Sequence, residues 1–300
     1  MTAGVLAVDK PAGPTSHDVV AVARRALGVR RVGHFGTLDP FASGLLVLGV
    51  GPATRLAPFC VEHPKTYRAT VRLGARSDTD DSEGAIEEVA VPEIPDRSAV
   101  QRACATWEGS VLQVPPAYSA KHVGGGRAYA LARAGRAVTL EAVRVRIDSI
   151  RIERYAWPEL DLLVQCGPGT YLRALARDVG EQLGTGGLCA VLRRLASGPY
   201  RVEDALPWGG LVDPEAARAA LEPSWTAVAD LPAARLDTQG ARAFSAGREV
   251  PIRPGDLAPG WVRVHGEHGF VGIGRVEADA GDTAWLRPRR VLFPDGEDSA

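Results

Sequence analysis

This chain of 300 residues has few cysteines and only short apolar runs, and each of these features excludes certain classes of protein. The four cysteines, Cys60, Cys104, Cys166 and Cys189, form no C-x-x-C pair and have no histidine at ligand spacing. This pattern predicts reduced, mostly buried thiols and argues against a zinc site. The longest apolar run, residues 44–51, is far too short to cross a bilayer, and the first residues lack the basic start of a secretory leader. We therefore expect a cytoplasmic protein with no membrane contact.

Lysine is also scarce, whereas arginine is abundant. Lys10, Lys65 and Lys121 are the only lysines among 35 basic residues, which leaves 35 − 3 = 32 arginines. With 36 acidic residues the net charge is -1, so a histone-like polycation is excluded, although a local basic face stays possible. A content of 45% hydrophobic and 24% charged residues excludes wholesale disorder. The length suits one large domain, or a medium domain and a small one.

Hydrophobic periodicity and turn residues predict an α+β chain. Strands are expected at residues 5–8, 45–50, 66–73, 85–91, 143–153 and 160–166, and helices after the capping residues Ser16, Ser98, Thr170 and Asp213. A break of parity near Ser149 predicts a bulge. This order is no regular βαβ series, so we expect a mixed, largely antiparallel central sheet flanked by helices. From about residue 230, short strands and many turns predict a separate small β-rich module.

Two short motifs resemble ligand-binding loops but differ from them at a decisive position. Residues 49–54 follow a strand like half of a dinucleotide loop, yet Thr54 stands where the third glycine belongs. A plain turn is the favoured interpretation, and a nucleotide-dependent enzyme stays the lesser alternative. The acidic turn at 78–84 approaches a calcium loop, but Glu83 stands where an EF-hand needs glycine. We predict a solvated hairpin turn there.

The segment GHFGTLDPFASGLL at residues 33–46 presents a single carboxylate on a sharply shaped loop. Pro40 disfavours helical geometry at Asp39, and Gly36 and Gly44 permit turns that other residues cannot make. Asp before Pro is also a common turn element, so the spacing alone leaves a structural turn as the more frequent interpretation.

This segment resembles the catalytic signature of the TruB-type tRNA pseudouridine synthases, in which the aspartate of GTLDP is essential. The other matching motifs, in family order, are VDKP at 8–11, TSH at 15–17, KTYR at 65–68, PPAYSA at 115–120, GTYLR at 169–173 and LRR at 192–194. Together they span residues 5–205, and the tail from 230 is similar in a general way to a PUA-like module.

The resemblance implies the pseudouridine-synthase fold, with a catalytic domain at 1–228, an RNA-gripping insertion at about 113–142 and a PUA-like RNA-binding module at 229–300. It implies isomerisation of uridine to pseudouridine at position 55, in the T-loop of tRNA. The enzyme would break the N1–C1′ bond, rotate the base and rejoin it through C5, with no cofactor and no metal. The expected partner is the T-arm of tRNA, and the enzyme would act as a monomer with no protein partner. A non-catalytic RNA-binding protein on the same scaffold is the alternative.

Three catalytic residues follow from the resemblance: Asp39, Arg173 and Tyr67. Asp39 would be ionised and would either attack C1′ or take the C2′ proton. Arg173 would pair with it, because a guanidinium binds a carboxylate well and offsets the cost of enclosing its charge. Tyr67 would stack on the target base and could serve proton transfer at C5. Without the resemblance, Tyr67 would be assigned to packing and Arg173 to the solvated start of a helix.

Four substrate-binding residues follow in the same way: His34, Tyr171, Leu192 and Asp81. His34 would displace the base from its stack, and Tyr171 and Leu192 would form walls of the base pocket. Asp81 matches an acidic position near the family's site. Where the family places an apolar residue and then lysine after Tyr-Ser-Ala, this chain has Lys121 and His122, so no single phosphate contact is assigned there. Arginines at 24–31 and 287–290 favour further contacts with phosphates.

Overall fold

The structure is a computed structural model that describes residues 2–118, 140–253, 257–278 and 284–293, with the backbone of 122–123 and 126–127. Most of the RNA-gripping insertion predicted at about 113–142 lies outside the described residues. No helix in these ranges is long and apolar enough to cross a membrane.

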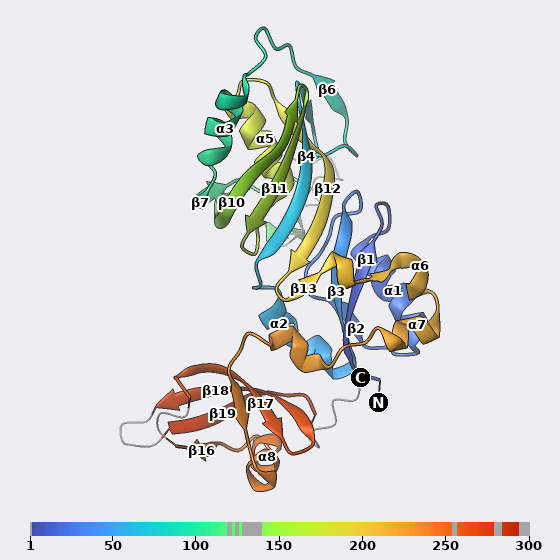
Figure 1. Cartoon of the computed structure of the whole chain (residues 1–300), viewed down its shortest axis with the longest axis vertical. Coiled ribbons are helices and arrows are strands. Elements are labelled where there is room, and N and C mark those ends of the chain that lie inside the picture. Colours follow the sequence, from blue (N-terminus) through green and yellow to red (C-terminus); the bar gives the residue numbers. More distant parts are fainter. Residues whose placement is uncertain are drawn as a thin grey trace.

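Ten strands of the described chain form one mixed sheet (Figure 1). They are β1 (Gly4–Lys10), β2 (Val32–His34), β3 (Ser43–Val50), β4 (Lys65–Leu73), β7 (Gly109–Gln113), β10 (Val143–Ala156), β11 (Glu159–Cys166), β12 (Gly187–Ser197), β13 (Tyr200–Arg201) and β14 (Leu206–Pro207). The order is β14-β1-β3-β12-β4-β11-β10-β7, with β13 beside β12 and β2 beside β3. Only the β1–β14 and β3–β12 pairs are parallel within this sheet of described residues. The predicted α+β class with a mixed, largely antiparallel sheet is therefore confirmed.

Helices cover the sheet in two groups (Figure 1). They are α1 (Ser16–Leu27), α3 (Arg97–Ala105), α5 (Leu172–Gln182), α6 (Trp208–Leu211) and α7 (Pro214–Ala219). Val19 of α1, Val100 of α3 and Leu175 of α5 are buried in one cluster with Leu6 and Val71 of the sheet. One hydrophobic core thus joins both groups of helices to the sheet.

The first helix begins one residue earlier than predicted. Thr15, not Ser16, caps α1, because its hydroxyl accepts from the Asp18 N–H while the Asp18 carboxylate accepts from the Thr15 N–H. Ser16 is instead buried and bonds Leu38, its Oγ donating to the carbonyl and accepting from the N–H, both at 2.9 Å. Gly28, at φ 68°, ends the helix as predicted.

Two other predicted caps are wrong, and one is confirmed. Asp96 caps α3 in place of Ser98, since its carboxylate reaches the third N–H of the helix. Thr170 does not cap α5; its hydroxyl donates to the Gly167 carbonyl, and α5 starts without a side-chain cap. Asp213 caps α7 as predicted.

The long strand β10 changes register where the sequence predicts a bulge, between Ile147 and Ser149. A second, unpredicted shift lies between Ile152 and Arg154. In β4 the predicted alternation holds, with Ala69, Val71 and Leu73 buried.

The C-terminal part has a five-stranded sheet of its own among the described residues (Figure 1). Its elements are β15 (Ala233–Arg235), α8 (Thr238–Ser245), β16 (Val250–Ile252), β17 (Gly260–Gly266), β18 (Gly269–Ala278) and β19 (Ala284–Val291). Phe244 and Leu286 lie in its own core. Phe270 and Phe293, however, pack in a second cluster with residues of the main domain such as Leu45. The module is therefore attached to the main sheet by a shared hydrophobic cluster.

Candidate active site

Asp39 lies on the loop between β2 and β3, and Lys10 holds one side of that loop. The Lys10 side chain is completely buried at the end of β1, and its Nζ donates to the carbonyls of Pro11, Pro14 and Pro40 at 2.8, 2.9 and 3.2 Å. Burial lowers the Lys10 pKa to about 8, while the charge of Asp39 opposes that shift. The N–H of Gly13 also donates to the Pro40 carbonyl, at 2.8 Å. The backbone next to Asp39 is thus fixed by several hydrogen bonds.

Arg194 of β12 holds the other side of the same loop. It is 3% exposed, and its guanidinium donates to the carbonyls of Leu45, Thr37 and Gly36 at 2.6, 3.2 and 3.2 Å. Gly44, at φ 100°, permits the β3 and β12 backbones to come close at this point, because a Cβ there would lie 2.3 Å from the Arg194 carbonyl oxygen. Arg194 belongs to the LRR motif, but nothing local in the sequence indicates its three distant acceptors.

Arg173, the first-turn residue of α5, reaches Asp39. Its Nε lies 3.0 Å from Asp39 Oδ2, without the alignment of a hydrogen bond, so the contact is an ion pair. The other guanidinium nitrogens donate to the carbonyls of Thr79 and Tyr118 at 3.0 and 2.9 Å. The Arg173 side chain is 6% exposed and that of Asp39 is 34% exposed. The cation is enclosed, while its carboxylate partner still faces the surface.

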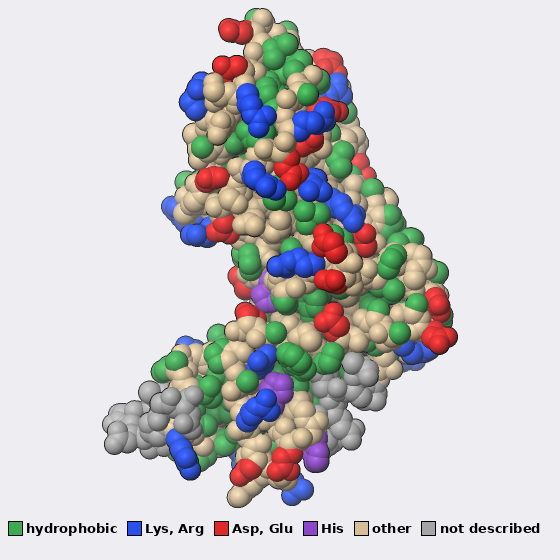
Figure 2. Space-filling view, in the orientation of Figure 1, with side chains coloured by type: hydrophobic (Ala, Val, Ile, Leu, Met, Phe, Trp, Pro, Cys, Tyr) green, Lys and Arg blue, Asp and Glu red, His purple; other side chains and the backbone are tan. Residues whose placement is uncertain are grey.

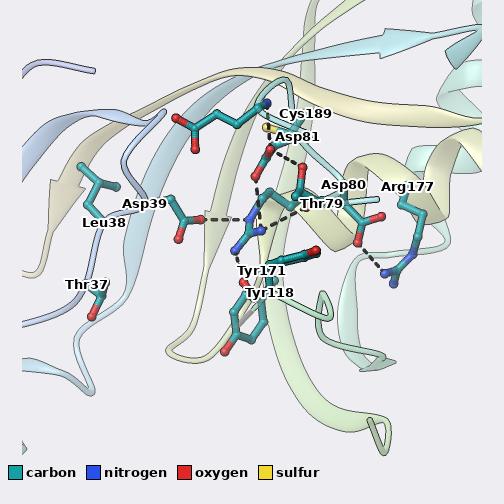
Figure 3. A network of polar contacts seen from close by, with 12 residues as sticks. Thr37, Leu38, Asp39, Thr79, Asp80, Asp81, Tyr118, Tyr171, Arg177 and Cys189 are labelled. Atoms are coloured by element: carbon teal, nitrogen blue, oxygen red, sulfur yellow. Dashed lines mark hydrogen bonds and ion pairs between the residues drawn. The ribbon is translucent and has the colours of Figure 1, made fainter. Parts of the chain in front are cut away.

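Asp81 is the second carboxylate on the same guanidinium (Figure 3). Its Oδ2 lies 3.3 Å from Arg173 NH1, and its Oδ1 accepts from the Thr79 hydroxyl and the Glu83 N–H at 2.5 and 3.0 Å. Asp81 is only 4% exposed. The predicted solvated turn is therefore wrong at this residue, because the partner that buries it lies 92 residues further along the chain.

Tyr67 lies on β4 directly across from Arg194 of β12. Burial raises the pKa of its phenol, and the neighbouring Arg194 guanidinium opposes this shift. Because Asp39 also raises that pKa, the two expected catalytic groups are close enough to interact electrostatically. Tyr67 is a neutral phenol at neutral pH and can donate a proton in a hydrogen bond.

Tyr171 stands immediately before α5 and is fixed through its backbone. Its N–H donates to Gln113 Oε1 at 2.9 Å, and its carbonyl accepts from Gln113 Nε2 at 3.1 Å. The Tyr171 ring lies beside the Asp39 and Asp81 network (Figure 3). Leu192, 5% exposed on β12, belongs to the main hydrophobic core.

His34 ends β2 and makes an edge contact with the ring of His17, with 5.5 Å between centroids. Its Nδ1 is buried and has no hydrogen-bond partner among the described residues. Burial lowers the His34 pKa, and the nearby His17 and Arg194 lower it further, so the ring is neutral at neutral pH. The structure thus brings the carboxylates of Asp39 and Asp81 into contact with Arg173. His34 instead contacts His17, and Leu192 packs in the main hydrophobic core.

Comparison with known proteins shows which family this chain belongs to. Residues 24–172 match the TruB family pseudouridylate synthase N-terminal domain, and residues 232–292 match the C-terminal domain of pseudouridine synthase II TruB. A protein of Thermobifida fusca named tRNA pseudouridine synthase B is 44% identical over 259 residues, which cover 83% of this chain and 87% of that protein. One of the same name from Gluconacetobacter diazotrophicus is 40% identical over 302 residues, covering 96% and 97%.

The chain belongs to the TruB family of pseudouridine synthases. It is an enzyme, an isomerase of the tRNA pseudouridine synthase type, and the alternative of a non-catalytic RNA-binding protein is set aside.

Solved structures place the TruB-family chain in the pseudouridine-synthase fold. A chain in the crystal structure of a Cbf5-Nop10-Gar1 complex superposes with a TM-score of 0.75 at 25% identity, covering 99% of this chain and 87% of that one. A chain of the archaeal box H/ACA sRNP Nop10-Cbf5 complex gives 0.74 at 24% identity, covering 100% and 89%.

The loop at 49–54 is the basis of the alternative that the protein is a nucleotide-dependent enzyme. In the structure, side chains of this TruB-family protein occupy the inside of the loop. A Cβ on Gly49 would lie 2.5 Å from the Phe35 ring, and the Thr54 hydroxyl donates to the Gly51 carbonyl at 2.9 Å. Val50 and Gly51 are buried. The loop is a turn from β3 into a short 3-10 helix, as favoured, and its side chains leave no open cradle for a phosphate.

Proposed function

We propose that this TruB-family enzyme converts uridine to pseudouridine in the T-loop of tRNA, with Asp39 as the reacting carboxylate. The observation that carries the proposal is the unequal burial of the ion pair formed by Asp39 and Arg173. The Arg173 cation is enclosed and held by four acceptors, whereas a third of the Asp39 side chain is exposed. A carboxylate fixed by a buried cation and open on one side can meet a substrate in its charged form.

The network also explains how two carboxylates are retained near one cation. Taking an unpaired carboxylate out of water costs several kcal/mol, and Arg173 lies within ion-pair distance of both Asp39 and Asp81. Asp81 has the further support of the Thr79 hydroxyl and the Glu83 N–H. In the proposed reaction Asp81 therefore orients Arg173, and Asp39 reacts, at C1′ or by taking the C2′ proton.

Tyr67 is proposed as the platform for the target base. Its ring lies beside Arg194, whose other contacts fix the loop of Asp39, so one side chain aligns the platform with the carboxylate. Stacking a base on an aromatic ring is worth about 1–3 kcal/mol, which helps to offset the few kcal/mol of extruding it. In the proposed reaction the neutral Tyr67 hydroxyl assists proton transfer at C5.

We propose that the remaining predicted residues contact the extruded base and its strand. His34, neutral and partly exposed at the end of β2, suits insertion in place of the base because a neutral ring costs less to desolvate than a charged one. Tyr171, beside the Arg173 network, and Leu192 would form walls of the base pocket.

We also propose a division of the chain into two parts with different roles. Residues 1–228 form the catalytic domain, and residues 229–300 form a PUA-like module that adds RNA contacts. Lys and Arg side chains are interspersed with Asp and Glu over the face seen in Figure 2, which is hollowed between the main domain and the module. Recognition would therefore rest on the shape of the folded T-arm as well as on charge. We expect the enzyme to act as a monomer in the cytoplasm, where tRNA is processed.

The direct test is to map pseudouridine in an unmodified tRNA transcript after incubation with the enzyme. Carbodiimide labelling followed by primer extension should show one new pseudouridine, in the T-loop, and an isolated T-arm hairpin should also be modified. A matched transcript with cytidine at that single position is the control and should stay unmodified. A modification confined to another arm of the tRNA would refute the T-loop assignment.

A further inference from the structure

A second arginine of α5 lies one helical turn beyond Arg173 and contacts the same two segments. Residues four apart share a helix face, so Arg173 and Arg177 project in the same direction. Arg173 binds the turn at residues 79–81 and the carbonyl of Tyr118. Arg177 binds Asp80 in that turn (Figure 3), and it also binds Val114, in the segment that leads to Tyr118. The two side chains form parallel links between the same parts of the chain.

The guanidinium of Arg177 is committed to protein acceptors. NH1 lies 2.8 Å from Asp80 Oδ2, NH2 donates to the Val114 carbonyl at 2.8 Å, and Nε donates to Asp178 Oδ1 at 2.9 Å. The Arg177 side chain is 20% exposed and that of Asp80 is 14% exposed. Because each guanidinium nitrogen has a protein acceptor, the geometry favours a structural link over a phosphate contact.

Asp80 has an unusual backbone that this link stabilises. Its φ is 60°, in the left-handed region that residues with a Cβ seldom adopt. Its carbonyl accepts from the Cys189 N–H of β12 at 2.9 Å, and its carboxylate is held by Arg177. The next residue is Asp81, which contacts Arg173. The orientation of Asp80 therefore decides where the Asp81 carboxylate points.

We propose that Arg177 and Asp80 form a positioning pair that keeps Arg173, and through it Asp39, in the reactive arrangement. Three of the four acceptors of Arg173, namely Thr79, Asp81 and Tyr118, belong to the two segments that Arg177 joins. Without the pair, these acceptors lose their common anchor and the Asp39–Arg173 contact loosens. The expected effect of this pair on the reaction rate rests on the proposed function.

The test compares Arg177→Gln, Asp80→Asn and the double variant with wild type, by single-turnover rate, tRNA Kd and melting temperature. Arg177→Gln should lower the rate about tenfold while the Kd stays within about twofold. Asp80→Asn should lower the rate similarly, and the double variant should be no slower than Arg177→Gln, because the two residues act as one unit. Arg177→Lys, which keeps the charge but cannot reach both acceptors at once, should recover part of the rate.

Asp178→Asn is the matched control, because it removes a carboxylate from Arg177 but leaves the links to Asp80 and Val114. Its rate should equal that of wild type. An unchanged rate in folded Arg177→Gln, a loss confined to the Kd, or multiplicative effects in the double variant would each overturn the proposal. If Arg177→Gln does not fold, Arg177→Lys and Asp80→Asn decide by the same criteria.

A crystal structure of Arg177→Gln, or of Asp80→Asn in its place, gives a readout that needs no substrate. We expect Arg173 Nε to have left the 3.0 Å contact with Asp39 Oδ2. An unmoved Arg173 would reject the positioning pair whatever the substrate is. A wild-type enzyme that leaves tRNA unmodified would reject the proposed function alone, so the two failures are distinguishable.

Discussion

The loop that carries Asp39 is also held by a buried cation, Lys10, which forms no ion pair with a carboxylate of the described residues. Its three donors match the three carbonyls of Pro11, Pro14 and Pro40. A protonated amine has three N–H groups and a neutral one has two, so its protonation state decides whether the loop of Asp39 is fully held. The shape of the site is thus coupled to a group with a pKa of about 8.

We expect the single-turnover rate to fall as the pH rises through about 8, because Lys10 then loses one donor to the loop. The stability effect of the same group has the opposite sign. The unfolded chain keeps this proton up to its ordinary value of 10.5, so between the two values the Lys10 contribution to the unfolding free energy rises with pH. Rates and melting temperatures measured from neutral to alkaline pH separate the two effects.

Lys10→Met removes the titrating group and should give a slower enzyme whose rate lacks this alkaline decrease. The same decrease in Lys10→Met as in wild type would assign it to another group.

Individual residues also show how far sequence reasoning reaches. The Asp39–Arg173 contact agrees with the pairing that the family resemblance implied. At Asp81 the local pattern predicts a solvated turn, because its partner is 92 residues away, whereas the family resemblance predicts a position near the site. The contacts by which Arg194 holds the Asp39 loop involve carbonyls that are 149, 157 and 158 residues away in the chain. Contacts of this kind follow from the assembled sheet and not from local pattern.

At the scale of elements, strand periodicity predicted β4 but not the central strand β12 at Gly187–Ser197, and three of the four predicted helix caps were wrong. β4 and the bulge in β10 were predictable because alternation is a repeated signal. The start of α1 depended on a choice between the adjacent Thr15 and Ser16, which Asp18 decides by completing the capping box. A single competing side chain can move a helix start by one residue.

The junction of β3 and β12 yields a prediction about Gly44. An added Cβ would meet the Arg194 carbonyl oxygen at 2.3 Å, at a φ of 100°. Backbone strain of about 1–3 kcal/mol and a clash of about 1–3 kcal/mol should together destabilise Gly44→Ala and slow turnover. Urea unfolding and single-turnover assays measure both effects.

Gly28→Ala is the control, because Gly28 has a φ of 68° but no neighbour within 4 Å of an added Cβ. It should lose about 1–2 kcal/mol of stability and keep its rate. Equal losses of stability in the two variants would mean that close packing of Arg194 on Gly44 is unimportant.

At the scale of the whole molecule, the C-terminal module is less separate than its sequence texture predicts. Phe270 of β18 and Phe293 pack with Val5 and Leu45 of the main sheet. The change from long strands to short ones predicts a boundary near residue 230. Strand length does not show which face of a strand is buried, or against what. Module and main domain should therefore unfold together.

Phe270→Ala should remove about 3–5 kcal/mol from this shared cluster. We expect one calorimetric transition in wild type, and in Phe270→Ala an earlier, separate transition of the module. Phe244→Ala, equally buried but within the module's own core, is the control and should weaken the module without removing the shared contact. Two transitions in wild type would contradict the shared cluster.

Asp39 is the proposed reacting group, and the release of tritium from tRNA whose uridines are tritiated at C5 tests this role most directly. Wild type should release the label of one uridine per tRNA, because the base is rejoined through C5. Asp39→Asn keeps the size of the side chain but loses its charge and nucleophile. It should release no tritium above background while its tRNA Kd stays within about threefold of wild type. Substantial release by Asp39→Asn would contradict the central claim.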